Sequence, residues 1–376
     1  MRSEAISSFL QERIDANDFP SAVYVVAENG EIIFHDALGH AVADPQMVAA
    51  RSDTIYDLAS LTKPLVTGLL AAMLIEQGEL DPNETIGNLL PEFYTSINSE
   101  ITINQLLMHT SGLPAWRPFY LLVDNADQIT SEISHTLGSG NQEPVTYSDL
   151  NFITVAAVIE RLTGEDLSEL ANEHIFSALG LGSTSFRPLY RFAKERIAAS
   201  EKGNAYEKET CIELDYLPGD QPVDINRHFR TDVIWGDVHD GNAWFMGGVG
   251  GHAGLFSTAD DVFRIALQFL PVHTTLLKSE TTDLFRTNFT QGMNEDRSVA
   301  FQLATTDGST AGALMSPESF GHNGFTGTSL WIDPVADRIF VLLTNRTHAH
   351  PLPFVNINSV RRHFHDLAVA GLEKNS

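Results

Sequence analysis

The sequence predicts an α/β protein of the α+β type, in which an antiparallel sheet flanked by helices carries an inserted, mainly helical lobe. Strand-forming segments occur near both ends, at about 22–37 and 320–346, and helical periodicity dominates between them. The chain of 376 residues is long enough for two lobes. We therefore expect residues 1–60 and 253–376 to form the α/β lobe and 61–252 the helical lobe, with any functional site in the cleft between them.

The N-terminal segment predicts a helix followed by a β-hairpin. Residues 22–27 and 31–37 are rich in β-branched and aromatic side chains, and they flank Asn29-Gly30, a strong two-residue turn signal. Before them, apolar residues recur at helical spacing, namely Ile6, Phe9, Leu10 and Ile14.

Glycines mark the ends of the helices predicted in the middle of the chain. A wide apolar face begins at about residue 60 and ends at Gly78. The segment ITINQLLMHTSGLP predicts a short helix that stops at Gly112, and NFITVAAVIERLTGE predicts an amphipathic helix closed by Gly164.

Strand signals return toward the C-terminus. Residues 320–334 and 338–346 predict two strands joined at the Pro334–Asp337 turn, and a final helix is expected at about 356–373. Before these strands, Ser257 is expected to cap a helix, and the polar segment 200–235 is expected to be a long irregular loop.

The charge balance excludes several kinds of partner. The chain has 49 acidic against 23 basic residues, a net charge of −26. This field repels phosphate backbones and anionic lipid, so we expect no nucleic acid and no membrane surface as partners. We find no window of about 18 apolar residues and no signal peptide, so we expect no membrane span. The protein is then cytoplasmic as written, or periplasmic or secreted if the sequence is that of a mature exported protein.

We expect neither a metal nor a cofactor. The glycine-rich segment 247–254 is not embedded in a β-α-β unit, so a dinucleotide site is not predicted. The histidines fit no metal-ligand spacing. Cys211 is the only cysteine, which rules out an intrachain disulfide.

Residues 57–68, DLASLTKPLVTG, contain the only Ser-x-x-Lys pattern in the chain, from Ser60 to Lys63. Side chains at i and i+3 share a helix face, so the lysine amine reaches the serine hydroxyl. A serine nucleophile needs a nearby base, and lysine serves when burial or neighbouring cations lower its pKa. Pro64 fits the first turn of the helix. The alternative is two solvated side chains, since the tetrapeptide alone is weak evidence.

Two further segments present polar groups near a predicted helix start and on a predicted strand. In VTYSDLNF, Tyr147 either transfers a proton or belongs to a capping segment with Ser148 or Asp149 as the N-cap. In GHNGFTGTS, Gly324 marks either a bulge or the close approach of another backbone or a ligand. Free N–H groups of an edge strand can supply part of an oxyanion hole.

Taken in order, these segments resemble the serine β-lactamase and penicillin-binding protein superfamily. The nearest likeness is its class C-like branch, which includes DD-peptidases, family VIII esterases and penicillin-binding protein 4B-like hydrolases. The resemblance covers most of the chain and is carried by DTIYDLASLTKP (53–64), LLMHTSGLP (106–114), YSDLNF (147–152), DVHDGNAWFMGGVGGHAGLFSTADD (237–261) and FGHNGFTGTSLWIDP (320–334). It implies a β-lactamase/transpeptidase-like fold and reaction through a covalent acyl-enzyme.

The resemblance also implies roles for individual residues. Ser60 would be the acylated nucleophile, Lys63 its base partner and Tyr147 a second proton-transfer group. The backbone N–H groups of Ser60 and Phe325 would form the oxyanion hole. The candidate substrate-binding residues are Asp149, Asn151, His252, His322, Asn323, Gly324 and Phe325.

The chain departs from the family pattern at two positions. Asp149 stands where the Tyr-x-Asn motif has asparagine; a carboxylate cannot donate to a substrate carbonyl, but it could hold Lys63 charged or bridge through water. His322 replaces the lysine of Lys-Thr-Gly, and a histidine of ordinary pKa is mostly neutral at pH 7. Arg346 could restore the missing charge. These departures favour simple esters or amides over β-lactams.

The sequence as a whole therefore predicts a serine acyl hydrolase that acts on a small-molecule ester, amide, β-lactam or peptide. A carboxylesterase or a D-Ala-D-Ala carboxypeptidase is favoured. The alternatives are a true class C-like β-lactamase and a non-catalytic penicillin-binding-like scaffold or ligand-binding protein. The oligomeric state is not predicted.

Overall fold

The computed structural model describes residues 1–138, 143–217 and 228–374. Its main sheet has seven strands in the order β3-β2-β1-β12-β11-β10-β9, and each neighbouring pair is antiparallel. The strands are β1 Ser21–Glu28, β2 Glu31–Val42, β3 Val48–Ala49, β9 Gln302–Leu303, β10 Phe320–Asn323, β11 Ser329–Asp333 and β12 Arg338–Thr344. Both ends of the chain thus build one sheet, as expected, whereas the exact lobe boundaries stay a prediction.

The two ends of the chain meet where β1 pairs with β12. The pairing runs from Ala22 opposite Thr344 to Glu28 opposite Arg338, and the Arg338 guanidinium lies 2.8 Å from the Glu28 carboxylate. The β1–β2 hairpin forms with both turn residues at positive φ, 54° at Asn29 and 76° at Gly30. This is the backbone that a two-residue turn of this type requires, and the sequence prediction is confirmed.

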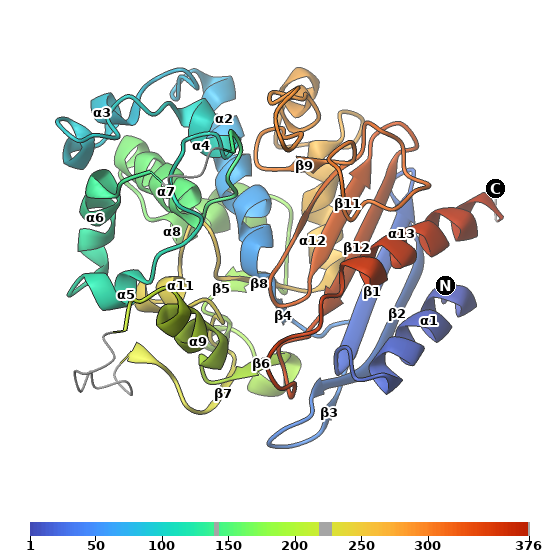
Figure 1. Ribbon diagram of the computed structural model, residues 1–376. Helices are drawn as coiled ribbons and strands as arrows, with labels where there is room; N and C mark the ends of the chain where they lie inside the picture. Colours follow the sequence, from blue (N-terminus) through green and yellow to red (C-terminus); the bar gives the residue numbers. More distant parts are fainter. Residues whose placement is uncertain (139–142, 218–227, 375–376) are drawn as a thin grey trace.

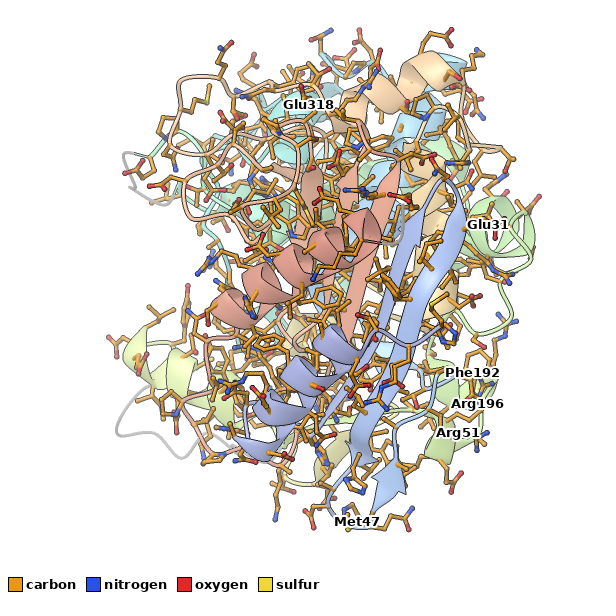
Figure 2. The ribbon with its side chains drawn as sticks, turned by 90° about the vertical axis from the view of Figure 1, so that its right-hand side faces the viewer. Glu31, Met47, Arg51, Phe192, Arg196 and Glu318 are labelled. Carbon is orange, nitrogen blue, oxygen red and sulfur yellow. The ribbon has the colours of Figure 1, made fainter. Side chains whose placement is uncertain are left out.

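Helices cover both faces of the sheet. On one face α1 (Glu4–Asp15) lies beside α13 (Asn358–Glu373), and Figure 2 shows both in front of the strands. On the opposite face α12 (Ala259–Ala266) packs against β1 and β12. Alternate residues of β1 therefore enter different cores: Ala22, Tyr24 and Val26 pack under α1 and α13, and Val23, Val25 and Ala27 pack on the other side.

The remaining helices and two small sheets lie beside the main sheet (Figure 1). Strands β4 (Tyr56–Asp57), β8 (Leu255–Ser257) and β5 (Ser185–Phe186) pair in the order β4-β8-β5, and β6 (Ala199–Lys202) pairs with β7 (Val233–Trp235). The helices are η1 Ala59–Leu61, η2 Lys63–Gly68, α2 Leu69–Gln77, α3 Ile86–Leu89, η3 Pro91–Phe93, α4 Ile103–Leu107, α5 Phe119–Leu122, η4 Ala126–Gln128, α6 Ile129–His135, α7 Asp149–Thr163, α8 Leu167–Ala171, η5 Asn172–Ser177, η6 Pro188–Tyr190, η7 Lys194–Arg196, α9 Ala205–Glu213, α11 Gly241–Phe245, η8 Leu267–Phe269 and η9 Ser279–Phe285.

One stretch corrects the expectation about apolar windows. The continuous helix Ala59–Gln77, formed by η1, η2 and α2, is long and apolar enough to cross a membrane by length and composition. However, 83% of that window is buried inside the protein, because the helix runs through the main core. The apolar character of this segment is therefore that of a core helix.

Three local predictions were wrong. Residues 320–334 form two strands, because the chain reverses between them with Gly327 at φ 115° and a hydrogen bond from the Gly324 N–H to Thr328 O (2.8 Å). Part of the segment 200–235 is regular, since α9 buries Glu207 and Cys211; its residues 218–227 lie outside the described part. Helix α12 is capped by Thr258 rather than by Ser257, which belongs to β8.

Candidate active site

Ser60 lies just after strand β4, in the short helical turn η1. The preceding residue, Ala59, has φ 47°, a conformation that costs a non-glycine residue about 1–3 kcal/mol unless its surroundings hold it. The buried Asp57 carboxylate supplies this support, because it accepts hydrogen bonds from the N–H groups of Ala59 (2.9 Å) and His239 (2.7 Å). Asp57 thus fixes the backbone bend that presents Ser60.

The segment between β10 and β11 holds the other side of the Ser60 turn. The Thr326 hydroxyl donates to Asp57 O (2.7 Å), and the Thr328 hydroxyl donates to Leu58 O (3.0 Å). A Cβ at Gly324 would lie 2.5 Å from Leu58 O, so only glycine permits this approach. The predicted close approach at this glycine is therefore to the backbone that carries Ser60.

Lys63 is fully buried, and its amine lies between three acceptors. Nζ is 3.1 Å from Ser60 Oγ, 3.1 Å from His252 O and 2.6 Å from Asp149 Oδ1. Burial by itself lowers the pKa of Lys63, but the Asp149 carboxylate and Tyr147 outweigh it, so the pKa is raised above its usual value. The sequence argument required a lowered pKa, and the structure contradicts it because Asp149 replaces a neutral amide.

Tyr147 joins this group from the loop before α7. The Lys63 amine lies 4.9 Å from the centroid of the Tyr147 ring. The phenol oxygen is buried and has no hydrogen-bond partner within strict geometry among the described residues, although it is close enough to Lys63 and Ser60 for both to lower its pKa. Burial has the larger effect and raises the pKa of Tyr147, which keeps the phenol protonated at neutral pH.

His109 positions the Tyr147 loop, and the sequence argument had missed it. Its buried ring lies 4.6 Å from the Tyr147 ring, and its Nδ1 accepts a hydrogen bond from the Ser148 N–H (3.0 Å). Burial and nearby cations hold the pKa of His109 well below 6.5, which keeps this acceptor neutral. His109 belongs to the segment LLMHTSGLP, which was part of the resemblance. No role had been assigned to the His109 side chain.

Asn151 does not reach the cavity beside Ser60, contrary to expectation. Its side chain is fully buried on α7, where its Oδ1 accepts from the Ser111 hydroxyl (2.6 Å) and its Nδ2 lies 3.3 Å from His109 Nδ1. The register of α7 explains this: Asp149 lines the cavity, and a residue two positions further along a helix points elsewhere.

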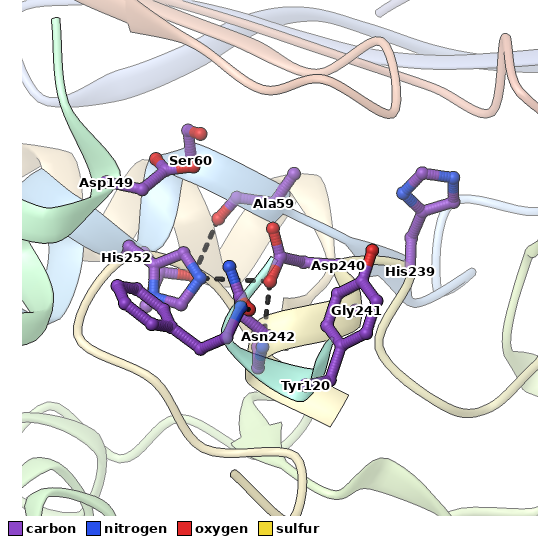
Figure 3. A network of polar contacts seen from close by, with 12 residues as sticks. Ala59, Ser60, Tyr120, Asp149, His239, Asp240, Gly241, Asn242 and His252 are labelled. Atoms are coloured by element: carbon purple, nitrogen blue, oxygen red, sulfur yellow. Dashed lines mark hydrogen bonds and ion pairs between the residues drawn. The ribbon is translucent and has the colours of Figure 1, made fainter. Parts of the chain in front are cut away.

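His252 also lies behind the site rather than in it. Its ring is buried, and its Nε2 lies 2.9 Å from Oδ1 of Asp240 (Figure 3). Asp240 is the N-cap residue of α11. The backbone carbonyl oxygen of His252, and not its ring, contacts Lys63. Asp149, Asp240 and His252 place their polar atoms within 4.8 Å of one another, and the Lys63 ammonium is the cation at this cluster.

Strand β10 and the two residues after it contribute the other cavity residues that were expected, His322, Asn323, Gly324 and Phe325. Burial first, and then the charges of Lys63 and Arg297, hold the pKa of His322 well below 6.5, so this ring is neutral. Its Nδ1 lies 2.9 Å from the Asn323 carbonyl oxygen and must donate to it, which leaves Nε2 as an acceptor.

The cavity has a volume of about 600 Å³, and Ser60, Tyr147 and Asp149 form part of its wall. Phe325 shares an aromatic and apolar wall with Trp116, Tyr206 and Leu214, three residues that sequence analysis missed. Arg346 and Arg361 also line the cavity. Of these two, only Arg346 was noticed in the sequence, because it ends the predicted strand 338–346. Arg361 lies on α13 and reaches the cavity through tertiary packing.

The backbone completes an acyl-transfer site. Ser60 is in the first turn of a helix, where N–H groups lack intrahelical acceptors. In the part of the chain that the structure describes, the Phe325 N–H donates to no acceptor. A hydroxyl beside a lysine and a phenol, with such donors at one cavity wall, defines the class of serine hydrolases that form an acyl-enzyme.

Comparison with known proteins identifies the family. The family described as Beta-lactamase matches residues 6–361, and the chain belongs to this family. The protein is accordingly a serine hydrolase. It is 29% identical, over 93% of this chain and 83% of the relative, to a protein of Escherichia coli (strain K12) named "Putative D-alanyl-D-alanine carboxypeptidase".

Solved structures show the same fold. EstCE1, described as a hydrolase with promiscuous acyltransferase activity, has a TM-score of 0.70 and 20% identity and covers 97% of both chains. A penicillin-binding protein homologue from Caulobacter crescentus has a TM-score of 0.71 and 17% identity over 98% of both chains. The predicted β-lactamase/transpeptidase-like fold is confirmed.

Proposed function

We propose that the protein is a carboxypeptidase of the D-Ala-D-Ala type, which hydrolyses the amide bond before a terminal carboxylate through an acyl-enzyme at Ser60. The observation that carries this proposal is a pair of cavity guanidiniums, Arg346 and Arg361, neither of which forms an ion pair with any described residue. In a chain of net charge −26, two cations without carboxylate partners in one cavity suit an anionic substrate group.

The arginines are held in place by backbone oxygens. Arg346 Nε donates to Phe325 O (2.7 Å) and its Nη1 to Val355 O (2.8 Å). Arg361 Nη2 donates to Gly324 O (2.8 Å) and Thr328 O (2.9 Å). Burial, and then the neighbouring charge of Arg346, lowers the pKa of Arg361 to about 9. A substrate carboxylate would compensate these two charges.

The curated relatives' name supports the same choice, since it names a terminal D-alanine as the leaving group. In the proposed reaction Ser60 Oγ attacks the penultimate carbonyl, and the N–H groups of Ser60 and Phe325 stabilise the oxyanion. Collapse releases the C-terminal amino acid and leaves an acyl-enzyme, which water hydrolyses.

The test compares a D-Ala-D-Ala peptide with a neutral ester, p-nitrophenyl butyrate, on the wild type and two variants. Ser60→Ala should abolish turnover of both substrates and the Ser60 adduct in intact-mass spectra. Arg346→Gln should raise KM for the peptide by about 10- to 100-fold, the scale of a lost hydrogen bond to a charged group, with a much smaller effect on the ester.

Arg297→Gln is the matched control, because Arg297 lines the same cavity but already pairs with Glu295 at 2.6 Å. It should leave the ratio of peptide to ester kcat/KM unchanged. Equal losses for peptide and ester in Arg346→Gln would contradict the carboxylate assignment. Turnover by Ser60→Ala at the wild-type rate would refute Ser60 as the nucleophile.

A carboxylesterase is the second candidate, and the aromatic wall favours it. Phe325 packs against Tyr206 with ring centroids 4.8 Å apart, and Trp116 and Leu214 extend this apolar surface. Neutral His322 adds no charge beside it. Turnover of butyrate and longer acyl esters with no detectable D-alanine release would select this candidate, and nitrocefin hydrolysis in parallel would instead indicate a β-lactamase.

A further inference from the structure

We propose that Asp149 is the final acceptor of the proton that Ser60 loses during acylation, and that Lys63 passes this proton on while staying an ammonium. The inference deepens the proposed function, on which it rests only in requiring that Ser60 be acylated. It assigns Asp149 a role in proton transfer, whereas sequence analysis placed it among the substrate-binding residues.

As an ammonium, Lys63 has three protons and no lone pair. Its Nζ donates hydrogen bonds to Ser60 Oγ and His252 O, each at 3.1 Å, and forms an ion pair with Asp149 Oδ1 at 2.6 Å. The Tyr147 phenol is a further close neighbour. In this state Lys63 donates to Ser60 and cannot accept its proton. A proton must leave Nζ before or as the Ser60 proton arrives.

Of the three oxygens in contact with Nζ, only that of Asp149 can take this proton. The His252 oxygen is a backbone carbonyl, and Ser60 is the group being deprotonated. Asp149 is the first residue of α7, and it lines the cavity together with Ser60. The charged and titratable groups around this pair are Tyr147, His109, Asp240, His252, Arg297 and His322.

The other groups are less suited to the role. Tyr147 is a protonated phenol, and Asp240 Oδ1 already accepts from the Ala243 N–H (2.7 Å) and from His252. His322 Nε2 is a free acceptor, but it forms no hydrogen bond with Ser60 or Lys63 in the described structure.

As Ser60 Oγ bonds to the substrate carbonyl carbon, its proton moves to Lys63 Nζ, and a different proton moves from Nζ to Asp149 Oδ1. Lys63 keeps three protons, Asp149 becomes a carboxylic acid, and the negative charge moves to the substrate oxyanion. On collapse the proton returns from Asp149 through Lys63 to the leaving nitrogen. An asparagine at position 149 cannot take this proton.

The wild-type pH profile tests the proposal directly. The rate of pre-steady-state acylation by p-nitrophenyl butyrate is measured from pH 7 to 9.5, with the hydroxide background subtracted. Because p-nitrophenolate leaves without a proton, this rate reports removal of the Ser60 proton. We expect the rate to form a plateau over this pH range. If Lys63 had to be neutral, the rate would rise about ten-fold per pH unit, because its pKa lies above the usual lysine value.

Asp149→Asn should lower the acylation rate at pH 7 by about 100-fold or more and replace the plateau with a rate that rises with pH, since neutral Lys63 is then the remaining base. Asp240→Asn is the control, because it removes an equal charge near Lys63 without touching the 2.6 Å contact. It should keep the plateau, whatever its absolute rate.

A rising wild-type profile, or a plateau within a few-fold of the wild-type rate in Asp149→Asn, would overturn the proposal. If Asp149→Asn does not fold, the wild-type profile alone decides. A wild type that forms no Ser60 adduct refutes the proposed function itself, and with it the proton transfer. Adduct formation with a rising profile refutes only the role of Asp149.

Discussion

At position 324 the chain has no room for a side chain. A Cβ there would lie 2.0 Å from Thr328 Oγ1 and 2.5 Å from Leu58 O, and the second of these atoms belongs to the backbone just before the nucleophile. Gly324 therefore sets the distance between β10 and the Ser60 turn, and with it the position of the Phe325 N–H.

Gly324→Ala should lower both stability and acylation rate. Because the neighbouring backbone must shift, we expect a loss of about 1–3 kcal/mol in the free energy of unfolding, the range for overpacking, and at least a ten-fold lower burst rate with p-nitrophenyl butyrate. Denaturant titration and burst kinetics measure the two effects.

Gly182→Ala provides the matched control, since a Cβ at Gly182 meets nothing within 4 Å and its φ is not in the left-handed region. It should change neither quantity appreciably. A Gly324→Ala enzyme with wild-type burst kinetics would show that the close approach of β10 is not needed for acylation.

Helix α9 and Asp240, the residue just before α11, line the cavity, and one carboxylate joins the two helices. Glu207 on α9 accepts from the N–H of Gly241, the first residue of α11 (2.7 Å), and from the Tyr120 hydroxyl (2.9 Å). Burial, and then the charge of Asp240, raises the pKa of Glu207 to about 7. The folded protein thus binds a proton at Glu207 that the unfolded chain releases at lower pH.

This raised pKa makes the free energy of unfolding depend on pH. Because the folded-state pKa is raised, stability falls as the pH rises from the ordinary glutamate range of about 4.5 to about 7. We expect the wild type to lose on the order of 2 kcal/mol more than Glu207→Gln between pH 5 and 8, since one pKa unit corresponds to about 1.4 kcal/mol.

Urea titrations at pH 5 and pH 8 measure this difference. Glu209→Gln, an exposed position on the same helix, should follow the wild type at both pH values. If Glu207→Gln loses as much stability as the wild type over this interval, the proton uptake assigned to Glu207 is wrong.

Over the whole molecule, the net charge of −26 is opposite in sign to the two arginines of the cavity. An anionic substrate meets a repulsive field at long range and the two arginines only inside the cavity. Salt screens exposed charges over about 10 Å at 0.1 M but screens buried ones much less. The protein should therefore capture anionic substrates better when the long-range field is screened.

We expect kcat/KM for the D-Ala-D-Ala peptide to rise a few-fold between 20 mM and 300 mM NaCl, with little change for p-nitrophenyl butyrate. The neutral ester controls for effects of salt on the fold and on the chemical step. A fall in the peptide value over this range would show that attraction by the arginines outweighs the field of the acidic surface.

The sequence alone determined the features that depend on neighbouring residues. Asn29-Gly30 fixed the hairpin, Gly78 and Gly164 ended their helices at φ 76° and 75°, and spacing brought Ser60 and Lys63 to one face. The order of the short motifs was enough to identify the fold and the family.

Tertiary structure alone decided the electrostatics and the cavity walls. The charge state of Lys63 depends on Asp149, which arrives on another helix, and no local pattern shows that their atoms lie 2.6 Å apart. Burial placed Asn151 and His252 behind the site, and packing of α13 brought Arg361 into it. These outcomes depend on distances between segments far apart in the sequence, whereas propensity and spacing describe only what lies within a few residues.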